Sequence, residues 1–158
     1  MEGGAGLVAP PMTDLASDHA IAAHAAKVQA ACLPKVEWTH AGHFAYALWC
    51  LRHAPDSATP EAMRETIMAL NDAHGTPNTD SAGYHHTITI ASLHAAQAVL
   101  EAHPGAPLGD VLAALMAGRF GRSDWILDHW SREVLFTPAA RRDWIAPDRA
   151  PLPTARFG

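Results

Sequence analysis

The chain has 158 residues, 11 of them histidine, and a formal net charge of −5 when the histidines are neutral. The length favours one domain with its own core, and the acidic balance without a long basic run argues against nucleic acid as a partner. No apolar stretch approaches the roughly 18 residues of a membrane span, and the first residues lack the basic and apolar regions of a secretion signal, so we expect a cytoplasmic protein without a membrane partner.

Helical signals follow one another along the chain, and no segment shows the alternation of a long strand. We predict main helices near 14–32, 36–52, 60–74 and 84–102, and shorter ones near 108–117, 124–130 and 138–144. Their ends are marked by capping residues, prolines and glycines, namely Thr13, Thr59-Pro60, Gly75, Pro104-Gly105 and Thr137-Pro138.

These elements predict an all-α fold, a helical bundle of about four main helices with a short helical C-terminal extension. We expect a flexible N-terminus over 1–12, a single helical domain over 13–146 and an extended tail over 147–158. The helical faces also allow a homo-oligomer.

A first histidine pair lies at the start of the second helix. His40 and His43 are three residues apart and continue the apolar stripe of that helix, so both rings are predicted to face the core. Imidazole is the commonest neutral metal ligand and a general acid or base at neutral pH. A buried ring needs a polar partner, which is either a metal ion or a hydrogen-bonding neighbour at the edge of the bundle.

A second pair, His85 and His86, follows Tyr84. Adjacent side chains diverge by about 100° on a helix, so only one of the two rings can face the same ion, and we assign His85 as that ligand. His86 is predicted beside the site or in solvent. Tyr84 is a candidate proton donor or substrate contact, or else a packing residue with its hydroxyl at the rim.

Glu37 precedes His40 by three residues, but this Glu-x-x-His element occurs once and the carboxylates of a di-iron site are missing. Glu37 is a candidate proton carrier, or a residue that orients His40. His74 either donates to the last carbonyls of its own helix or joins the site. The remaining histidines are expected at the surface or rim, namely His19, His24, His53, His94, His103 and His129.

The same residues resemble a functionally uncharacterised family of short bacterial helical proteins. That family has an x-His-x-x-His helix, an Ala-His-Gly turn and a Tyr-His-Glu-Thr motif, which are similar to Thr39–His43, Ala73–Gly75 and Tyr84–Thr87. Its C-terminal motifs are similar to Ser131–Arg141 and Trp144–Asp148. His86 stands where the family has glutamate. The resemblance implies a shared site and supplies no activity.

From these patterns we expect a small metal-dependent enzyme that acts on a small-molecule organic substrate. His40, His43 and His85 would hold one divalent transition metal, Zn, Fe, Ni or Cu, for hydrolase or lyase chemistry or, with a redox metal, oxidoreductase chemistry. The alternatives are a non-catalytic metal-binding or sensing module, and a structural protein with hydrogen-bonded core histidines. The catalytic candidates are Glu37, Tyr84 and His86.

Overall fold

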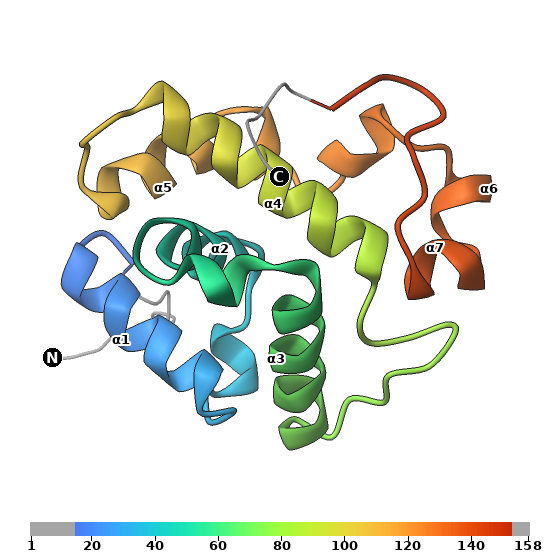
Figure 1. Cartoon of the computed structure of the whole chain (residues 1–158), viewed down its shortest axis with the longest axis horizontal. Helices are drawn as coiled ribbons and strands as arrows, with labels where there is room; N and C mark the ends of the chain where they lie inside the picture. Colours follow the sequence, from blue (N-terminus) through green and yellow to red (C-terminus); the bar gives the residue numbers. More distant parts are fainter. Residues whose placement is uncertain (1–14, 153–158) are drawn as a thin grey trace, which may run out of the picture.

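Seven α-helices and four 3-10 helices follow one another in residues 15–152, the part of the chain that the computed structural model describes (Figure 1). The α-helices are α1 (Asp18–Gln29), α2 (His40–His53), α3 (Pro60–Ala73), α4 (His86–Ala102), α5 (Leu108–Ala117), α6 (Arg132–Leu135) and α7 (Pro138–Arg142). The 3-10 helices are η2 (Lys35–Glu37), η3 (Pro55–Ala58), η4 (Arg119–Gly121) and η5 (Trp125–Asp128). The predicted all-α fold class is confirmed.

Helix α4 lies between two groups of helices and joins them. In Figure 1 it runs diagonally, with α1, α2 and α3 on one side and the C-terminal segments on the other. Helix α2 packs against α1, α4 and α5, and α4 also packs against α3 and α7. One hydrophobic core extends through these contacts, and its large fully buried side chains include Phe44, Leu93 and Trp130.

The helix starts follow the capping chemistry that the sequence predicts. Thr59 accepts a hydrogen bond from the amide of Ala62, with Pro60 in the first turn, and Thr137 caps α7 in the same way. Gly75 has a φ of +74° just after α3, as a left-handed helix end requires. The predicted cap Thr13 and the predicted segments 1–12 and 153–158 lie outside the described residues.

Several predicted boundaries are wrong. The first helix begins at Asp18, after the cap Ser17, and ends at Gln29 rather than running over 14–32, and the helix predicted over 124–130 is the shorter 3-10 helix η5.

Two further errors lie at histidine pairs. The predicted helix over 36–52 is divided, because Thr39 is extended and caps a new helix that begins at His40. Helix α4 begins at His86 rather than at Tyr84, and the side chain of His85 caps it by accepting a hydrogen bond from the amide of Ile88. A side-chain cap fixes each boundary more tightly than apolar periodicity does.

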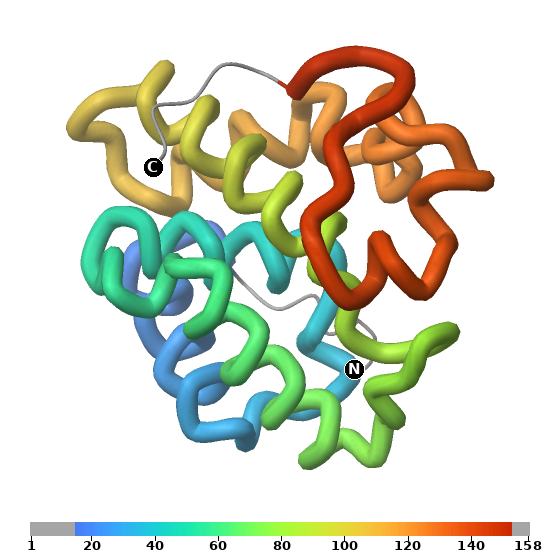
Figure 2. The backbone as a smooth tube through the Cα atoms, turned by 45° about the vertical axis from the view of Figure 1, so that its right-hand side comes forward, coloured from blue at the N-terminus to red at the C-terminus, as the bar shows by residue number. Residues whose placement is uncertain are grey.

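The C-terminal segment is bound to the first turn of α4. The Thr87 hydroxyl lies within hydrogen-bond distance of the carbonyls of Ala140 and Asp143 and accepts a bond from the amide of Ile145. The Trp130 indole donates to the carbonyl of Ile145. Figure 2 shows this segment, in red, passing over the N-terminal part of α4. The helical C-terminal extension is therefore part of the fold around the cavity described next.

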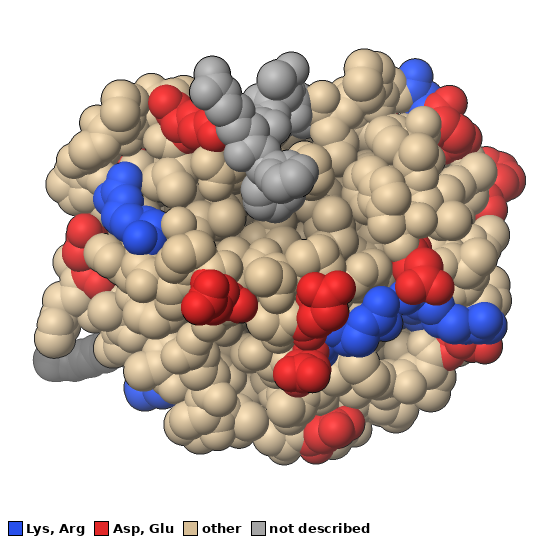
Figure 3. Space-filling model, viewed as in Figure 1, with Lys and Arg blue, Asp and Glu red and all other residues tan. Residues whose placement is uncertain are grey.

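No helix in residues 15–152 is long and apolar enough to cross a bilayer. On the face drawn in Figure 3, charged side chains are sparse and of both signs.

Candidate functional site

A cavity of about 500 Å³ opens between α2, α3, α4 and the loop that joins α3 to α4. Most of its described wall is apolar. Polar groups interrupt the wall at a few points, notably Lys35, His43, Tyr84 and Ser92. A mostly apolar cavity of this size with a few polar groups is the usual form of a site for a small molecule.

His43 extends from the first turn of α2 onto the cavity wall. Its ring stacks on Trp38, with 3.8 Å between the ring centroids and 24° between the planes. No residue within 15–152 forms a hydrogen bond with this ring. Part of the ring is accessible from the open cavity, but the surrounding protein desolvates it and, together with the nearby His40 and His24, lowers its pKa below the usual value. At neutral pH His43 is therefore a neutral base facing the cavity.

Gly42 allows the segment before α2 to approach the helix closely. A Cβ at this position would lie 2.7 Å from the carbonyl oxygen of Glu37 and 3.2 Å from Cε1 of His24. His24 uses this space to donate a hydrogen bond from Nε2 to the carbonyl of Gly42, at 2.9 Å. Trp38 therefore stacks with two histidine rings, with its ring centroid 6.3 Å from that of His24 and 3.8 Å from that of His43.

The other predicted ligands have protein partners. Nε2 of His40 donates to the carbonyl of Phe120, and Nε2 of His85 donates to that of Leu135, each at 2.7 Å. Since Nδ1 of His85 also accepts the bond that caps α4, both nitrogens of this ring are occupied. His43 and His85 line the same cavity, whereas His40 is not part of its described wall.

Within 15–152, no three histidine, cysteine, aspartate or glutamate side chains are grouped closely enough to hold a metal ion. The predicted trio of His40, His43 and His85 is therefore not brought together as one centre. The ring of His74 does not bond to the last carbonyls of its own helix, so this one of its two predicted roles is wrong. Its Nε2 donates to the carbonyl of Leu33, at 2.7 Å, and the residue lines the cavity.

The three catalytic candidates lie in different surroundings. Tyr84 lines the cavity, and its hydroxyl is 2.6 Å from Nδ1 of His86 behind it. Both residues are buried, so the reading of His86 as a solvated residue is wrong. Burial lowers the pKa of His24, and the negative charge of Glu37 partly offsets this by raising it. Glu37 therefore lies near His24.

The loop that carries Tyr84 is held by hydrogen bonds within the loop and by contacts with α3 and α7. Asn78 accepts a hydrogen bond from the Tyr84 amide and itself donates to the side chain of Asp72. Gly83, with a φ of +81°, makes the turn before Tyr84. Arg141 of α7 donates to the carbonyls of Gly83 and Tyr84. This part of the cavity wall is therefore fixed before any ligand binds.

Sequence reasoning missed two buried histidines and one cavity cation. His24 and His129, expected at the surface or rim, are each 3% exposed. His24 lies four residues before the buried Val28 on α1, and this helical spacing was a usable signal. His129 is held by Arg119 and by the carbonyl of Ala150, contacts that no local pattern reveals. Lys35, the cavity cation, belongs to no motif in the sequence.

Comparison of the chain with protein-family models, with curated proteins and with solved structures finds no match. The family resemblance noted in the sequence stays a prediction, and the function has to be argued from the cavity itself.

Proposed function

We propose that the protein binds a small organic anion with an apolar or aromatic body in the cavity between α2, α3 and α4. The observation that carries this proposal is the composition of the cavity wall. Most of the wall surface is apolar, with Trp38, Ile67 and Leu93 among the residues that provide it, and this surface would desolvate the body of a ligand.

The charge of the wall favours an anion. Lys35 contributes an ammonium group, and no aspartate or glutamate is among the described lining residues. His85 accepts and donates hydrogen bonds as a neutral ring, and His43 has a lowered pKa. A carboxylate, sulfonate or similar group near Lys35 would therefore meet one positive charge and no negative charge on the described wall.

We assign His43 as the general base of this site. A general base needs a neutral form at working pH and a lone pair within reach of the ligand. His43 meets both conditions with a lowered pKa and no ring hydrogen bond to a described residue. Both ring nitrogens of His85 already have partners, and the His74 ring is tied to the carbonyl of Leu33 through Nε2. Stacking on Trp38 fixes the plane of its ring.

The metal-dependent reaction expected from the sequence stays a separate prediction. A metal bound at this cavity would take His43 as its first ligand. Nδ1 of His85 could join such a metal only by giving up the hydrogen bond from the Ile88 amide. His74, by contrast, could offer Nδ1 while its Nε2 still donates to the carbonyl of Leu33. The anion-binding proposal leaves the hydrogen bond at His85 intact.

Binding of 1-anilinonaphthalene-8-sulfonate, an aromatic anion with environment-sensitive fluorescence, tests the proposed function. We expect saturable binding at one site, and a loss of at least about tenfold in affinity in Ser92→Trp, because the indole occupies the cavity. Lys35→Met should weaken binding by roughly threefold to tenfold, the effect of one partly exposed charge. Fluorescence titration gives all three affinities.

Lys27→Met is the matched control, since Lys27 is the other lysine of the chain and lies exposed on α1. It should bind the dye as the wild type does. Equal affinities for the wild type and Ser92→Trp, with far-ultraviolet circular dichroism and the free energy of unfolding unchanged, would show that the dye binds elsewhere and that the proposal is wrong.

A second expected result concerns the reactivity of His43. Diethyl pyrocarbonate acylates neutral imidazole nitrogens that are free and accessible. We expect His43 to be modified readily and to be protected by saturating dye, whereas the exposed His19 and His53 react equally with and without dye. Mass spectrometry of peptides after brief treatment measures this. Absence of dye protection at His43 would contradict its placement beside the ligand.

A further inference from the structure

Tyr84 and His86 form a buried hydrogen-bonded pair at the cavity wall. The hydroxyl oxygen of Tyr84 is 2.6 Å from Nδ1 of His86, a short hydrogen bond. Tyr84 is 5% exposed and His86 is 7% exposed, and only Tyr84 is among the cavity-lining residues. The tyrosine thus meets the ligand space, and the histidine supports it from behind.

The proton in this pair can be placed in two ways. If Tyr84 donates to Nδ1, its oxygen can only accept a bond from the cavity. If His86 carries its hydrogen on Nδ1 and donates to the Tyr84 oxygen, the phenolic O–H is released from His86 and can donate to a ligand oxygen in the cavity, in competition with the Thr89 hydroxyl beside it. Both arrangements are neutral, so a ligand can select between them by a change of tautomer without a change of charge.

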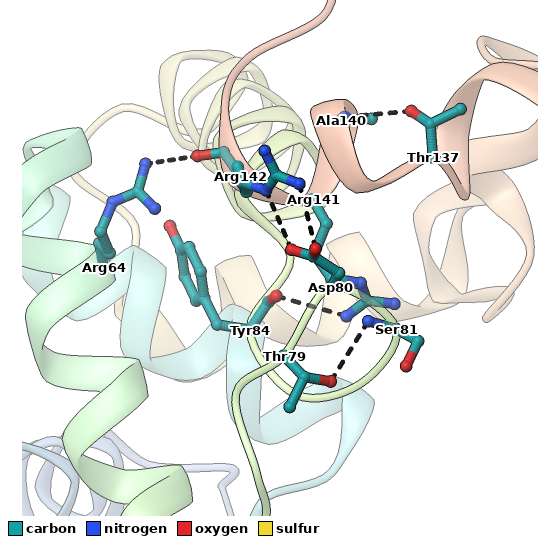
Figure 4. A network of polar contacts seen from close by, with 9 residues as sticks. All are labelled: Arg64, Thr79, Asp80, Ser81, Tyr84, Thr137, Ala140, Arg141 and Arg142. Carbon is teal, nitrogen blue, oxygen red and sulfur yellow. Dashed lines mark hydrogen bonds and ion pairs between the residues drawn. The ribbon is translucent and has the colours of Figure 1, made fainter.

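The surroundings keep both groups in these neutral forms. Burial raises the pKa of Tyr84 to about 12, and burial, with the charge of Arg64, lowers the pKa of His86. The guanidinium of Arg64 lies 5.5 Å from the centre of the Tyr84 ring. Figure 4 shows the ring extending from its loop toward Arg64 on α3.

The position of Tyr84 is set by hydrogen bonds from its own loop and from α7. Arg141 donates to the Tyr84 carbonyl, and Asn78 accepts from the Tyr84 amide. Arg142 holds the same loop through two hydrogen bonds to the carboxylate of Asp80, at 2.9 and 3.0 Å (Figure 4). A donor held in this way is preorganised, which is what selective recognition of an oxygen atom requires.

We propose that the Tyr84 hydroxyl, supported by Nδ1–H of His86, donates the hydrogen bond that recognises an oxyanion or carbonyl oxygen of the ligand in the cavity. This inference rests on the proposed function and deepens it. The ligand would carry such an oxygen in addition to its apolar body. His86 is a positioning residue here, because it acts through Tyr84.

The probe for the test is 4-nitrophenolate, an aromatic oxyanion whose visible absorption responds to hydrogen bonding. At a pH where the probe is mostly ionised, we expect the wild type to bind it and Ser92→Trp to bind it at least about tenfold more weakly. Tyr84→Phe should weaken binding by about tenfold or more, the usual effect of removing a hydrogen bond to a charged group.

Tyr46→Phe is the matched control. Tyr46 is also buried and lines the cavity, but its hydroxyl is enclosed and has no hydrogen-bond partner among the described residues, so a ligand cannot reach it and its loss should change the affinity less than about twofold. In His86→Gln the absorption of the bound probe should shift toward that of free phenolate. A packing role of His86 alone would leave that absorption unchanged.

The experiment distinguishes an error in the role assigned to Tyr84 from the absence of an oxyanion site. If Ser92→Trp blocks the probe but Tyr84→Phe binds it as the wild type does, the role assigned to Tyr84 is wrong and the cavity remains a binding site. If the wild type binds the probe no better than Ser92→Trp does, the oxyanion site is absent, and the dye titration then decides on the proposed function.

Discussion

The protein should lose stability steeply as the pH falls from about 7.5 to 5. Burial lowers the pKa of His24, His85 and His86 below the usual value of 6.5. Below pH 6.5 the unfolded chain therefore binds more protons than the folded chain does. The stabilisation from these neutral rings is complete above pH 6.5 and decreases as the pH falls toward their folded-state pKa values.

The expected slope is large because three buried rings titrate in the same direction. Each can contribute up to about 1.4 kcal/mol to the free energy of unfolding per pH unit. The exposed carboxyls of Asp80 and Asp148 have pKa values lowered from 3.8, so they titrate below this range. Urea denaturation at several pH values measures the free energy of unfolding directly.

Two variants show which histidine rings cause the change in the free energy of unfolding with pH. His24→Phe should flatten it by up to about 1.4 kcal/mol per pH unit, since one titrating ring is removed. His19→Gln removes an exposed histidine of the same helix and should leave the slope as it is. A free energy of unfolding that stays constant from about pH 7.5 to 5 would mean that these rings take up protons equally well in the folded chain.

The second large effect is expected for Thr87→Val, with a loss of about 2–4 kcal/mol in the free energy of unfolding. Thr87 is fully buried, and its hydroxyl accepts from the Ile145 amide at 3.1 Å and lies 2.7 Å from the Ala140 carbonyl. Valine keeps the size but leaves these backbone groups without a partner. Chemical denaturation gives the loss, and hydrogen exchange should be faster at the Ile145 amide.

Thr89→Val, two residues further along α4, is the control. The Thr89 hydroxyl donates to the carbonyl of His85, which also accepts from the backbone amide of Thr89. Removing this hydroxyl leaves no carbonyl unpaired and should cost less than about 1 kcal/mol. Equal losses in the two variants would contradict the role given to Thr87 in holding the C-terminal segment.

Local chemistry explains what could be predicted of the fold. The Thr59-Pro60 and Thr137-Pro138 starts and the left-handed Gly75 depend on neighbours within a few residues, so the sequence states them directly. The all-α class follows from the same signals repeated along the chain. The boundary errors at His40 and His85 arose because extended capping residues interrupted continuous apolar patterns.

The candidate site was predicted only in part. His43, Tyr84 and His85 were selected from the sequence, and all three line one cavity. Their roles differ from the expected ones, because His85 caps α4 and binds a distant carbonyl. Lys35 was missed because an isolated lysine has no spacing that sets it apart, whereas the burial of His24 was missed although its spacing from Val28 on α1 indicated it.

The sequence by itself determined the helices, their caps and which side chains could do chemistry. Only the tertiary structure decided which of these side chains are free to do it. The carbonyl partners of His74, His85 and His40 come from positions 41, 50 and 80 residues away along the chain. A buried ring forms a hydrogen bond with an acceptor that lies next to it in the folded protein. Helix packing determines which acceptor that is, and spacing along the chain does not.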